Sequence, residues 1–163
     1  MIRANEEEMK PSNLAFVVIG TFFLWVSWLF FNGGSTFDVF VPRTNNSSKI
    51  ILNTVLSGSI SGIVSTYLKP YFVNKDRFYD IAGLCNGILA GLVSVTAACH
   101  DIPPFVAFFI GIIGGAVYCF GIKFILFCKV DDPVEASVVH GCGGLWGVIA
   151  AGLFNQRTGL LMY

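Results

Sequence analysis

The sequence predicts an all-α integral membrane protein with five transmembrane helices. Hydrophobic residues make up 55% of the 163 residues and charged residues only 12%, whereas soluble domains carry roughly 25% charged residues. The charges cluster between five apolar stretches, each close to the ~20 residues with which a helix crosses a bilayer. These stretches are residues 14–31, 50–68, 81–98, 105–127 and 134–154. None shows the alternation of ten-residue segments that is typical of a membrane β-barrel.

The first apolar stretch, residues 14–31, is rich in aromatic side chains and follows a polar tail, residues 1–13. The tail is acidic, and no apolar stretch follows its basic residues directly, so it resembles neither a secretory signal nor a mitochondrial presequence. We therefore expect the first helix to act as its own insertion signal, at the start of a membrane domain that covers residues 14–155.

The second and third stretches carry small residues at a spacing of four. The second has a polar stripe and the third a glycine stripe, and both patterns are typical of helix-contact faces. The residues are Asn53, Ser57, Ser61 and Ser65 on the second stretch and Gly83, Gly87 and Gly91 on the third. For the serines, a second interpretation stays open, in which the hydroxyl groups line a pore.

The fourth and fifth stretches have recognisable ends. Lys123 lies near the end of the fourth, where its ammonium group can reach the membrane surface. Before the fifth, Asp132 can cap a helix, Pro133 suits its first turn, and Glu135 completes an Asp-x-x-Glu capping box.

His140 is the main functional candidate, because it lies within an apolar stretch that is long enough to span the bilayer. An ionisable side chain at that depth is costly unless it faces a partner or a polar path. The glycines that follow it, Gly143 and Gly147 among them, allow a neighbouring helix to approach closely. We expect a buried imidazole on a tightly packed helix.

The orientation follows from the positive charges, which number seven on one side and three on the other. The richer side is normally cytoplasmic. This places the N-terminus inside and, after five spans, the short C-terminal tail, residues 156–163, outside. The sequence does not distinguish the plasma membrane from the mitochondrial inner membrane.

The rest of the composition excludes several classes of function. The formal net charge is zero, so no nucleic-acid partner is expected. The five cysteines lie within or at the ends of the apolar stretches without a Cys-x-x-Cys pair. They are best interpreted as small membrane-embedded residues, with no metal site, no cofactor and no enzymatic activity.

Three motifs resemble the ammonium transporter (Amt/Rh) family. LWVSWLFFNGGS at residues 24–35 is similar to the family's sixth span, LCNGILAGLVSVTAA at residues 84–98 to the eighth, and DDPVEASVVHGCGGLWGVIAAGLF at residues 131–154 to the tenth. The pair Asn53-Thr54 stands where the seventh span has the same pair. The resemblance implies the second five-helix half of a fold built from two inverted repeats. Substrate sites of such folds lie between the repeats.

The resemblance also implies a pore. His140 corresponds to the second of two pore histidines, Phe31 to a ring that closes the outer mouth, and Ser35 to a hydroxyl that helps to recruit ammonium there. Trp28 corresponds to an indole to which we assign packing only. Since a cation is costly in an apolar channel, ammonium passes more easily after losing its proton, which a neutral imidazole can accept.

The chain departs from the family at several positions. The family's other pore histidine belongs to a span that this chain lacks, and His100 lies in a loop at the membrane edge. Ser27 and Phe30 replace glycines, and Phe30 should disturb close packing. Ala97 stands where proline is frequent, and the final long helix of the family is absent.

Two hypotheses follow. In the first, a second membrane chain, either a complementary half or an inverted copy, completes a pore for ammonium or ammonia. In the second, the chain is a non-conducting structural subunit of a larger complex, with an organellar (mitochondrial) complex as one option. An excised piece of a full transporter ranks lower, because the chain opens with Met1 and carries no tag.

Overall fold

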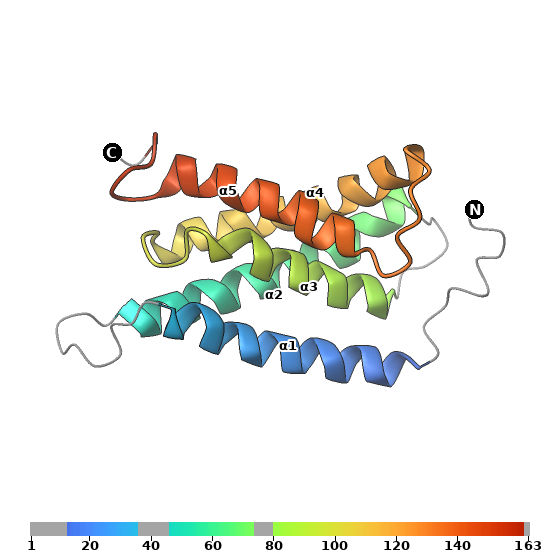
Figure 1. The fold of residues 1–163 in the computed structure, drawn as a ribbon, viewed down its shortest axis with the longest axis horizontal. Coiled ribbons are helices and arrows are strands. Elements are labelled where there is room, and N and C mark those ends of the chain that lie inside the picture. The colour runs from blue at the N-terminus through green and yellow to red at the C-terminus, as the bar shows by residue number, and fades with distance from the viewer. Residues whose placement is uncertain (1–12, 36–45, 74–79, 162–163) are drawn as a thin grey trace.

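The computed structural model describes residues 13–35, 46–73 and 80–161, and every regular element within them is a helix. The predicted all-α fold is therefore confirmed for this part of the chain. The helices are α1 (Leu14–Gly34), α2 (Asn46–Phe72), α3 (Ile81–Thr96), α4 (Pro104–Phe127), the π-helix η2 (Ser137–Cys142) and α5 (Gly143–Phe154). Figure 1 shows them side by side, roughly along one long axis.

Four helical segments of the described chain are long and apolar enough to cross a membrane: α1, most of α2, α4, and η2 together with α5. The predicted third span, residues 81–98, is shorter in the structure, because α3 has 16 residues and so rises only about 24 Å. Eight of those residues are buried among the other helices. Because half of α3 contacts other helices and not lipid, α3 need not be as long as the bilayer is thick.

Most predicted tail residues lie outside the described part of the chain. Of the tail at residues 1–13, only Asn13 is described, and its side-chain oxygen accepts a hydrogen bond from the Ala15 amide at the start of α1. Half of the ten charges that predict the orientation, Arg3, Lys10, Arg43, Lys75 and Arg77, also lie outside it. The orientation remains a prediction, and the two ends of the bundle are named after it. The inner end is where α1 and α3 begin and where α2 and α4 end.

The centre of the bundle is formed by α2, α3 and α4, which pack extensively on one another. Serines of α2 face glycines of α3 there. Ser57 Oγ donates to the Gly91 carbonyl at 2.8 Å, and Ser61 Oγ donates to the Gly87 carbonyl at 2.7 Å. The serine stripe is fully buried in this contact. Its interpretation as a helix contact is therefore confirmed, and the pore-lining alternative is wrong for this chain.

The glycines of this contact lie where any side chain would collide. A Cβ atom on Gly91 would lie 2.4 Å from Ser61 Cβ, and one on Gly87 would lie 1.7 Å from Ser65 Oγ. On α5, a Cβ on Gly147 would lie 2.9 Å from the Ser94 carbonyl oxygen of α3, whereas Gly143 is less crowded, with 3.4 Å to the Ala90 carbonyl.

The last helical segment begins later than the capping box predicts. Pro133 and Val134 form a turn, and the helix starts at Ala136. Asp132 does cap it, since its carboxylate accepts from the amides of Ala136 and Ser137 at 2.9 and 2.8 Å. The predicted role of Glu135 in the box is wrong, because its side chain turns into the bundle and binds Lys69.

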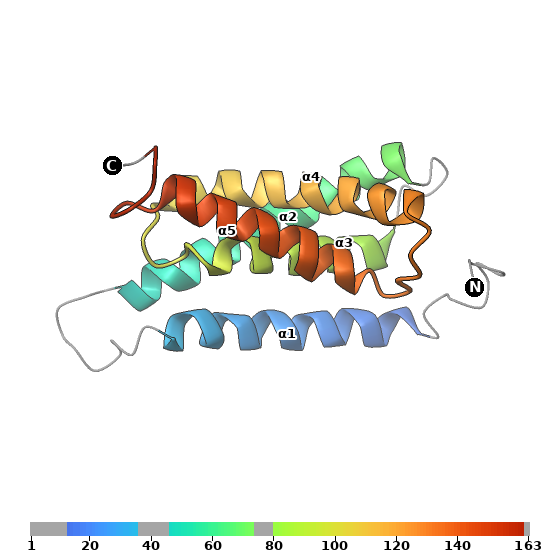
Figure 2. The ribbon, with the colours of Figure 1, turned by 45° about the horizontal axis from the view of Figure 1, so that its top comes forward.

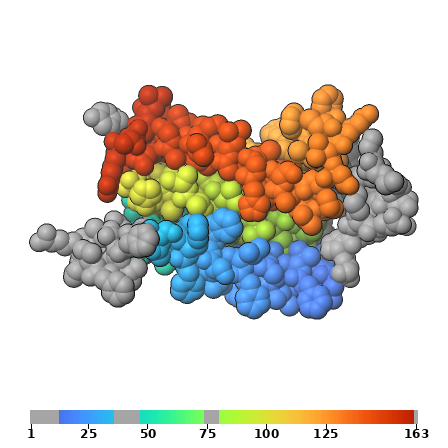
Figure 3. Space-filling view, viewed as in Figure 1, coloured from blue at the N-terminus to red at the C-terminus, as the bar shows by residue number. Residues whose placement is uncertain are grey.

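Helix α1 lies at the edge of the bundle, where it packs on α2 and α3. Only 6% of an 18-residue apolar stretch of α1 is buried within the structure, compared with 56% of such a stretch of α4. Figure 2 shows α1 at the outer edge of the bundle. Phe30 is 76% exposed and therefore disturbs no packing within this chain. Between α1 and the η2–α5 segment, α3 is visible at the surface (Figure 3). We call this side of the molecule the α1–α3–α5 face.

Candidate functional site: an exposed histidine on a half-open face

His140 lies in η2 on the α1–α3–α5 face. Its two predecessors, Val138 and Val139, are buried against α4, whereas His140 itself is exposed. The Gly143 amide donates to the carbonyl of Val138, five residues earlier, which is the hydrogen-bond pattern of a π-helix. The expectation of a buried imidazole is wrong for the described part of this chain, because none of its helices covers this face.

Trp28 is the aromatic neighbour of His140 across the face. The indole and imidazole rings are nearly parallel, with 16° between their planes and 6.5 Å between their centroids. The indole Nε1 donates to Thr96 Oγ1 of α3 at 2.8 Å, and the Thr96 hydroxyl donates to the Leu92 carbonyl at 2.7 Å. Trp28 therefore does more than pack, because it connects the imidazole to α3.

Phe31 and Ser35 continue from Trp28 along one side of α1 towards the outer end. The Phe31 ring meets the Trp28 ring edge-on, at 6.3 Å between centroids and 65° between planes. It is 62% exposed, so nothing in the described chain closes over it. Ser35 follows as the C-cap residue of α1, and its hydroxyl donates to the Phe31 carbonyl. The structure thus places Phe31, Trp28 and His140 in one row, with Ser35 one turn beyond.

The second histidine of the chain lies in a different place. His100 follows α3 in a short turn at the outer end, and its Nε2 is 3.2 Å from the Asp101 carboxylate. Arg157 binds the same carboxylate from the other side at 3.3 Å. The chain has only these two histidines, so it does not supply the pair of imidazoles that the family resemblance implies.

A charged cluster lies at the inner end of the bundle. Lys69 of α2 is 8% exposed, and its Nζ lies 2.9 Å from the Asp80 carboxylate and 3.0 Å from that of Glu135. One positive charge thus faces two negative charges in a largely apolar environment. Because a buried charge is tolerated only with such partners, these three residues depend on one another.

Two neutral side chains complete this inner cluster. Tyr118 of α4 is fully buried, accepts from Lys69 Nζ at 3.2 Å, and donates its hydroxyl proton to the Glu135 carboxylate. Asn86 of α3 donates to the same carboxylate oxygen of Glu135, Oε2, at 2.9 Å. Side chains from α2, α3 and α4 therefore converge on one carboxylate.

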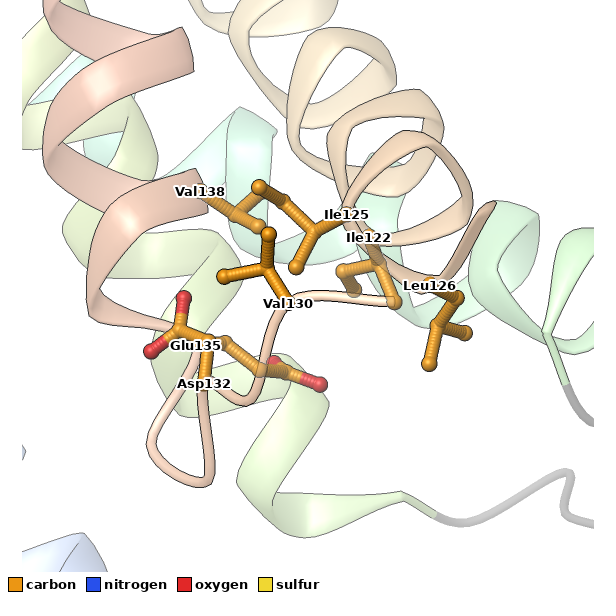
Figure 4. A pocket seen from close by; sticks show the side chains of 7 residues that line it. All are labelled: Ile122, Ile125, Leu126, Val130, Asp132, Glu135 and Val138. Carbon is orange, nitrogen blue, oxygen red and sulfur yellow. The ribbon is translucent and has the colours of Figure 1, made fainter. Parts of the chain in front are cut away.

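A small cavity of about 10 Å³ borders the inner cluster (Figure 4). It has room for about one water molecule. Its walls are aliphatic apart from two carboxylates, and the lining residues are Ile122, Ile125, Leu126, Val130, Asp132, Glu135 and Val138. Both carboxylates are already bound, Asp132 to backbone amides and Glu135 to the inner cluster. The cavity is therefore a packing space and not a substrate site.

The inner cluster and Thr96 are the features that sequence reasoning missed. In the charge count that predicts the orientation, Lys69 is one of the seven positive charges of the inner side, whereas in the structure it is buried and paired. A sequence signal exists, because Lys69 and Glu135 border apolar stretches where unpaired charges are costly. Nothing in their spacing of 66 residues indicates that they meet.

Comparisons with known proteins give the same assignment as the motifs. The model of the Ammonium Transporter Family matches residues 1–161. Ammonium transporter Amt2 of Archaeoglobus fulgidus is 38% identical over 94% of this chain and 32% of its own. Ammonium transporter 3 of Dictyostelium discoideum is 34% identical over 93% of this chain and 36% of its own.

The fold is shared as well. The crystal structure of Saccharomyces cerevisiae Mep2 superposes with a TM-score of 0.79 and 33% identity, over 90% of this chain and 33% of that one. The chain therefore spans about a third of the length of these relatives and has a partial transporter fold. It is a multi-pass membrane protein, and it belongs to the ammonium transporter family.

Proposed function

We propose that this chain forms one wall of a membrane pore for ammonium or ammonia, and that a second membrane segment packs on the α1–α3–α5 face to complete it. The observation that carries the proposal is the exposure of His140 within a segment that is long enough to span the bilayer. Without a cover, this imidazole would face acyl chains, where a polar group lacks hydrogen-bond partners.

The described residues fit distinct roles along such a pore. Ser35, at the outer end of the row, offers a hydroxyl that can accept a hydrogen bond from ammonium, and Phe31 restricts access just below it. Trp28 supports the imidazole from one side, which leaves a ring nitrogen of His140 free for a partner on the covering segment. A neutral imidazole can accept a proton from ammonium and return it, so that the substrate crosses the apolar middle uncharged.

The alternative is a non-conducting membrane subunit of a larger assembly, and one observation favours it. Only one of the chain's two imidazoles, that of His140, lies in the row with Phe31 and Trp28, and this row is open along its length. A chain that has lost its second wall can keep these residues as packing groups. In that case His140 contacts a packed side chain of a neighbouring subunit, and no conduit exists.

The test is methylammonium flux in liposomes, with two preparations. One contains the purified chain alone, and the other contains the complex isolated with the chain from its native membrane in mild detergent. We expect no flux from the chain alone, because one wall does not enclose a path. We expect flux from the complex that falls about 100-fold or more in His140→Ala, a typical effect of removing a proton-transfer group, and that is unchanged in His100→Ala.

The outcomes separate the hypotheses. A complex without flux, or with flux that His140→Ala leaves unchanged, rejects the pore and supports the structural subunit. Flux from the chain alone contradicts the statement that a second wall is required.

A further inference from the structure

Glu135 has an unusual backbone conformation for a glutamate. Its φ angle is 57°, in the left-handed region that residues other than glycine and asparagine rarely adopt. In the described chain the other non-glycine residue with such an angle is Lys129, which is exposed at the end of α4. A strained conformation persists only where the surrounding structure holds it.

The inner cluster is what holds Glu135. Its carboxylate binds Lys69 from α2, Tyr118 from α4 and Asn86 from α3. Three elements that come from distant parts of the sequence therefore fix the direction of this side chain. The left-handed backbone and these three contacts thus occur together at one residue just before a helix.

Glu135 also lies at the start of the turn that carries His140. The Val139 amide donates to the Glu135 carbonyl at 2.9 Å, and η2 begins two residues after Glu135. If this turn relaxed to a regular α-helix, its register would change by one residue, which turns a side chain by about 100° around the axis. Such a rotation would carry the imidazole away from Trp28.

We propose that Glu135, clamped by Lys69, is a positioning residue that keeps this turn in its π-helical form and so directs the His140 ring at Trp28. The placement of the ring does not depend on the pore proposed above, although its value for proton transfer does. A negative flux experiment would therefore reject the pore but not this inference. A negative result for Glu135 would reject this inference but not the pore.

The experiment reads the position of the imidazole directly. The full chain is labelled with [13Cε1]histidine, and its spectrum is recorded in detergent micelles at one fixed alkaline pH. The spectrum contains two histidine signals. The variant His100→Gln lacks the signal of His100, so the signal that remains is that of His140. Because a stacked indole shifts the protons of the ring beneath it, Trp28→Leu gives the position of the His140 signal without the stack.

We expect Glu135→Gln and Glu135→Gly to move the His140 signal most of the way to its position in Trp28→Leu. Gln keeps the shape of the side chain without its charge, and Gly accepts the φ angle without providing an anchor. The matched control is Asp131→Asn, an exposed carboxylate four residues earlier, which should leave the signal in place. Retained helicity and a single elution volume show that each variant is folded.

A His140 signal that stays at its wild-type position in both folded Glu135 variants overturns the inference. So does a wild-type signal that coincides with that of Trp28→Leu, because the stack would then be absent. If the Glu135 variants do not fold, the position of the His140 signal is measured in Tyr118→Phe, which removes only one hydroxyl from the inner cluster. A signal at the wild-type position in this variant likewise overturns the inference.

Discussion

Lys69 and His140 both lie on apolar helices, but their surroundings are opposite. Lys69 is buried with two carboxylates and a phenol around its ammonium group, whereas His140 is exposed with an indole beside it. The free energy of unfolding of the isolated chain should therefore depend strongly on the first residue and weakly on the second.

For Lys69→Met we expect a loss of about 3–5 kcal/mol in the free energy of unfolding, because two carboxylates remain near each other without their counter-charge. The measurement is unfolding in mixed micelles by an added denaturing detergent. Lys123→Met is the matched control. Lys123 is an exposed lysine of α4 whose Nζ lies 5.9 Å from the centroid of the Phe72 ring, an interaction worth at most ~1 kcal/mol at such sites. Equal losses in the two variants would refute the account of the inner cluster.

For His140→Leu we expect a change of less than about 1 kcal/mol in the isolated chain, because no described group donates to or accepts from the imidazole. The same detergent titration measures this change, and His100→Leu is measured in parallel as the variant of the other histidine. A loss of several kcal/mol would mean that the imidazole has a partner within the chain, which would contradict the open face.

Thr96 is a third position where one side chain has a measurable effect. Thr96→Val keeps the shape of the residue but removes the acceptor of the Trp28 indole proton. We expect a loss of roughly 1 kcal/mol, since hydrogen bonds between membrane helices average about 0.6 kcal/mol and reach about 1.7. Thr96→Ser, which keeps the hydroxyl, should restore most of it. Indole fluorescence of a variant with Trp28 as its single tryptophan would report the changed surroundings, and an unaltered spectrum would count against the contact.

At the scale of the elements, the contact between α2 and α3 depends on backbone approach at glycine. In Gly91→Ala the new methyl group would lie 2.4 Å from Ser61 Cβ and 2.5 Å from the Ser57 carbonyl oxygen. We expect a loss of about 3 kcal/mol, the upper part of the range for overpacked sites, again by detergent titration. Gly20→Ala on α1 has no atom within 4 Å of the new group and should change little. Similar effects of the two alanines would show that the helices are not closely packed.

The elements could largely be predicted from hydropathy, because each helix of a membrane protein is a long apolar run. The contact between the serine and glycine stripes was also predictable, since small residues at a spacing of four let two backbones meet. The structure at the start of η2 was not predictable. Asp132 and Glu135 have the spacing of a capping box, but Glu135 gains more from a buried lysine than from a helix amide, and this partner is 66 residues distant.

The site could be predicted only in part for a related reason. The motifs identify His140, Phe31 and Ser35 by resemblance, and the structure places them on one face. Exposure of that face does not follow from local sequence, because a segment that spans the bilayer looks the same whether it faces lipid or another helix.

At the scale of the whole molecule, the orientation can be tested by thiol labelling. Cys128 is exposed at the inner end, whereas Cys99 is buried at the outer end, where burial raises the pKa of its thiol from 9.0 to about 11. Since the thiolate is the reactive form, burial slows the reaction of Cys99 both by raising its pKa and by limiting access of the reagent. We expect a maleimide to label Cys128 at least tenfold faster than Cys99.

A membrane-impermeant maleimide turns this difference into a test of sidedness. On intact cells or organelles, Cys128 should react only after permeabilisation if the predicted orientation, with the inner end facing the interior, holds. The control is Cys128→Ser, which should remove the fast reaction. Fast labelling of Cys128 without permeabilisation would reverse the predicted orientation of the chain.

The peripheral position of α1 has a consequence for biogenesis. This helix precedes α2 and α3 in the chain, and its buried polar residue Asn32 donates to Thr54 of α2 at 3.1 Å. While a ribosome is still synthesising α2, that amide group has no partner on α2, and Trp28 has no Thr96. Helix α1 therefore stays in the lipid, or in contact with an insertion factor, until α2 and α3 have been inserted. It can then pack against them.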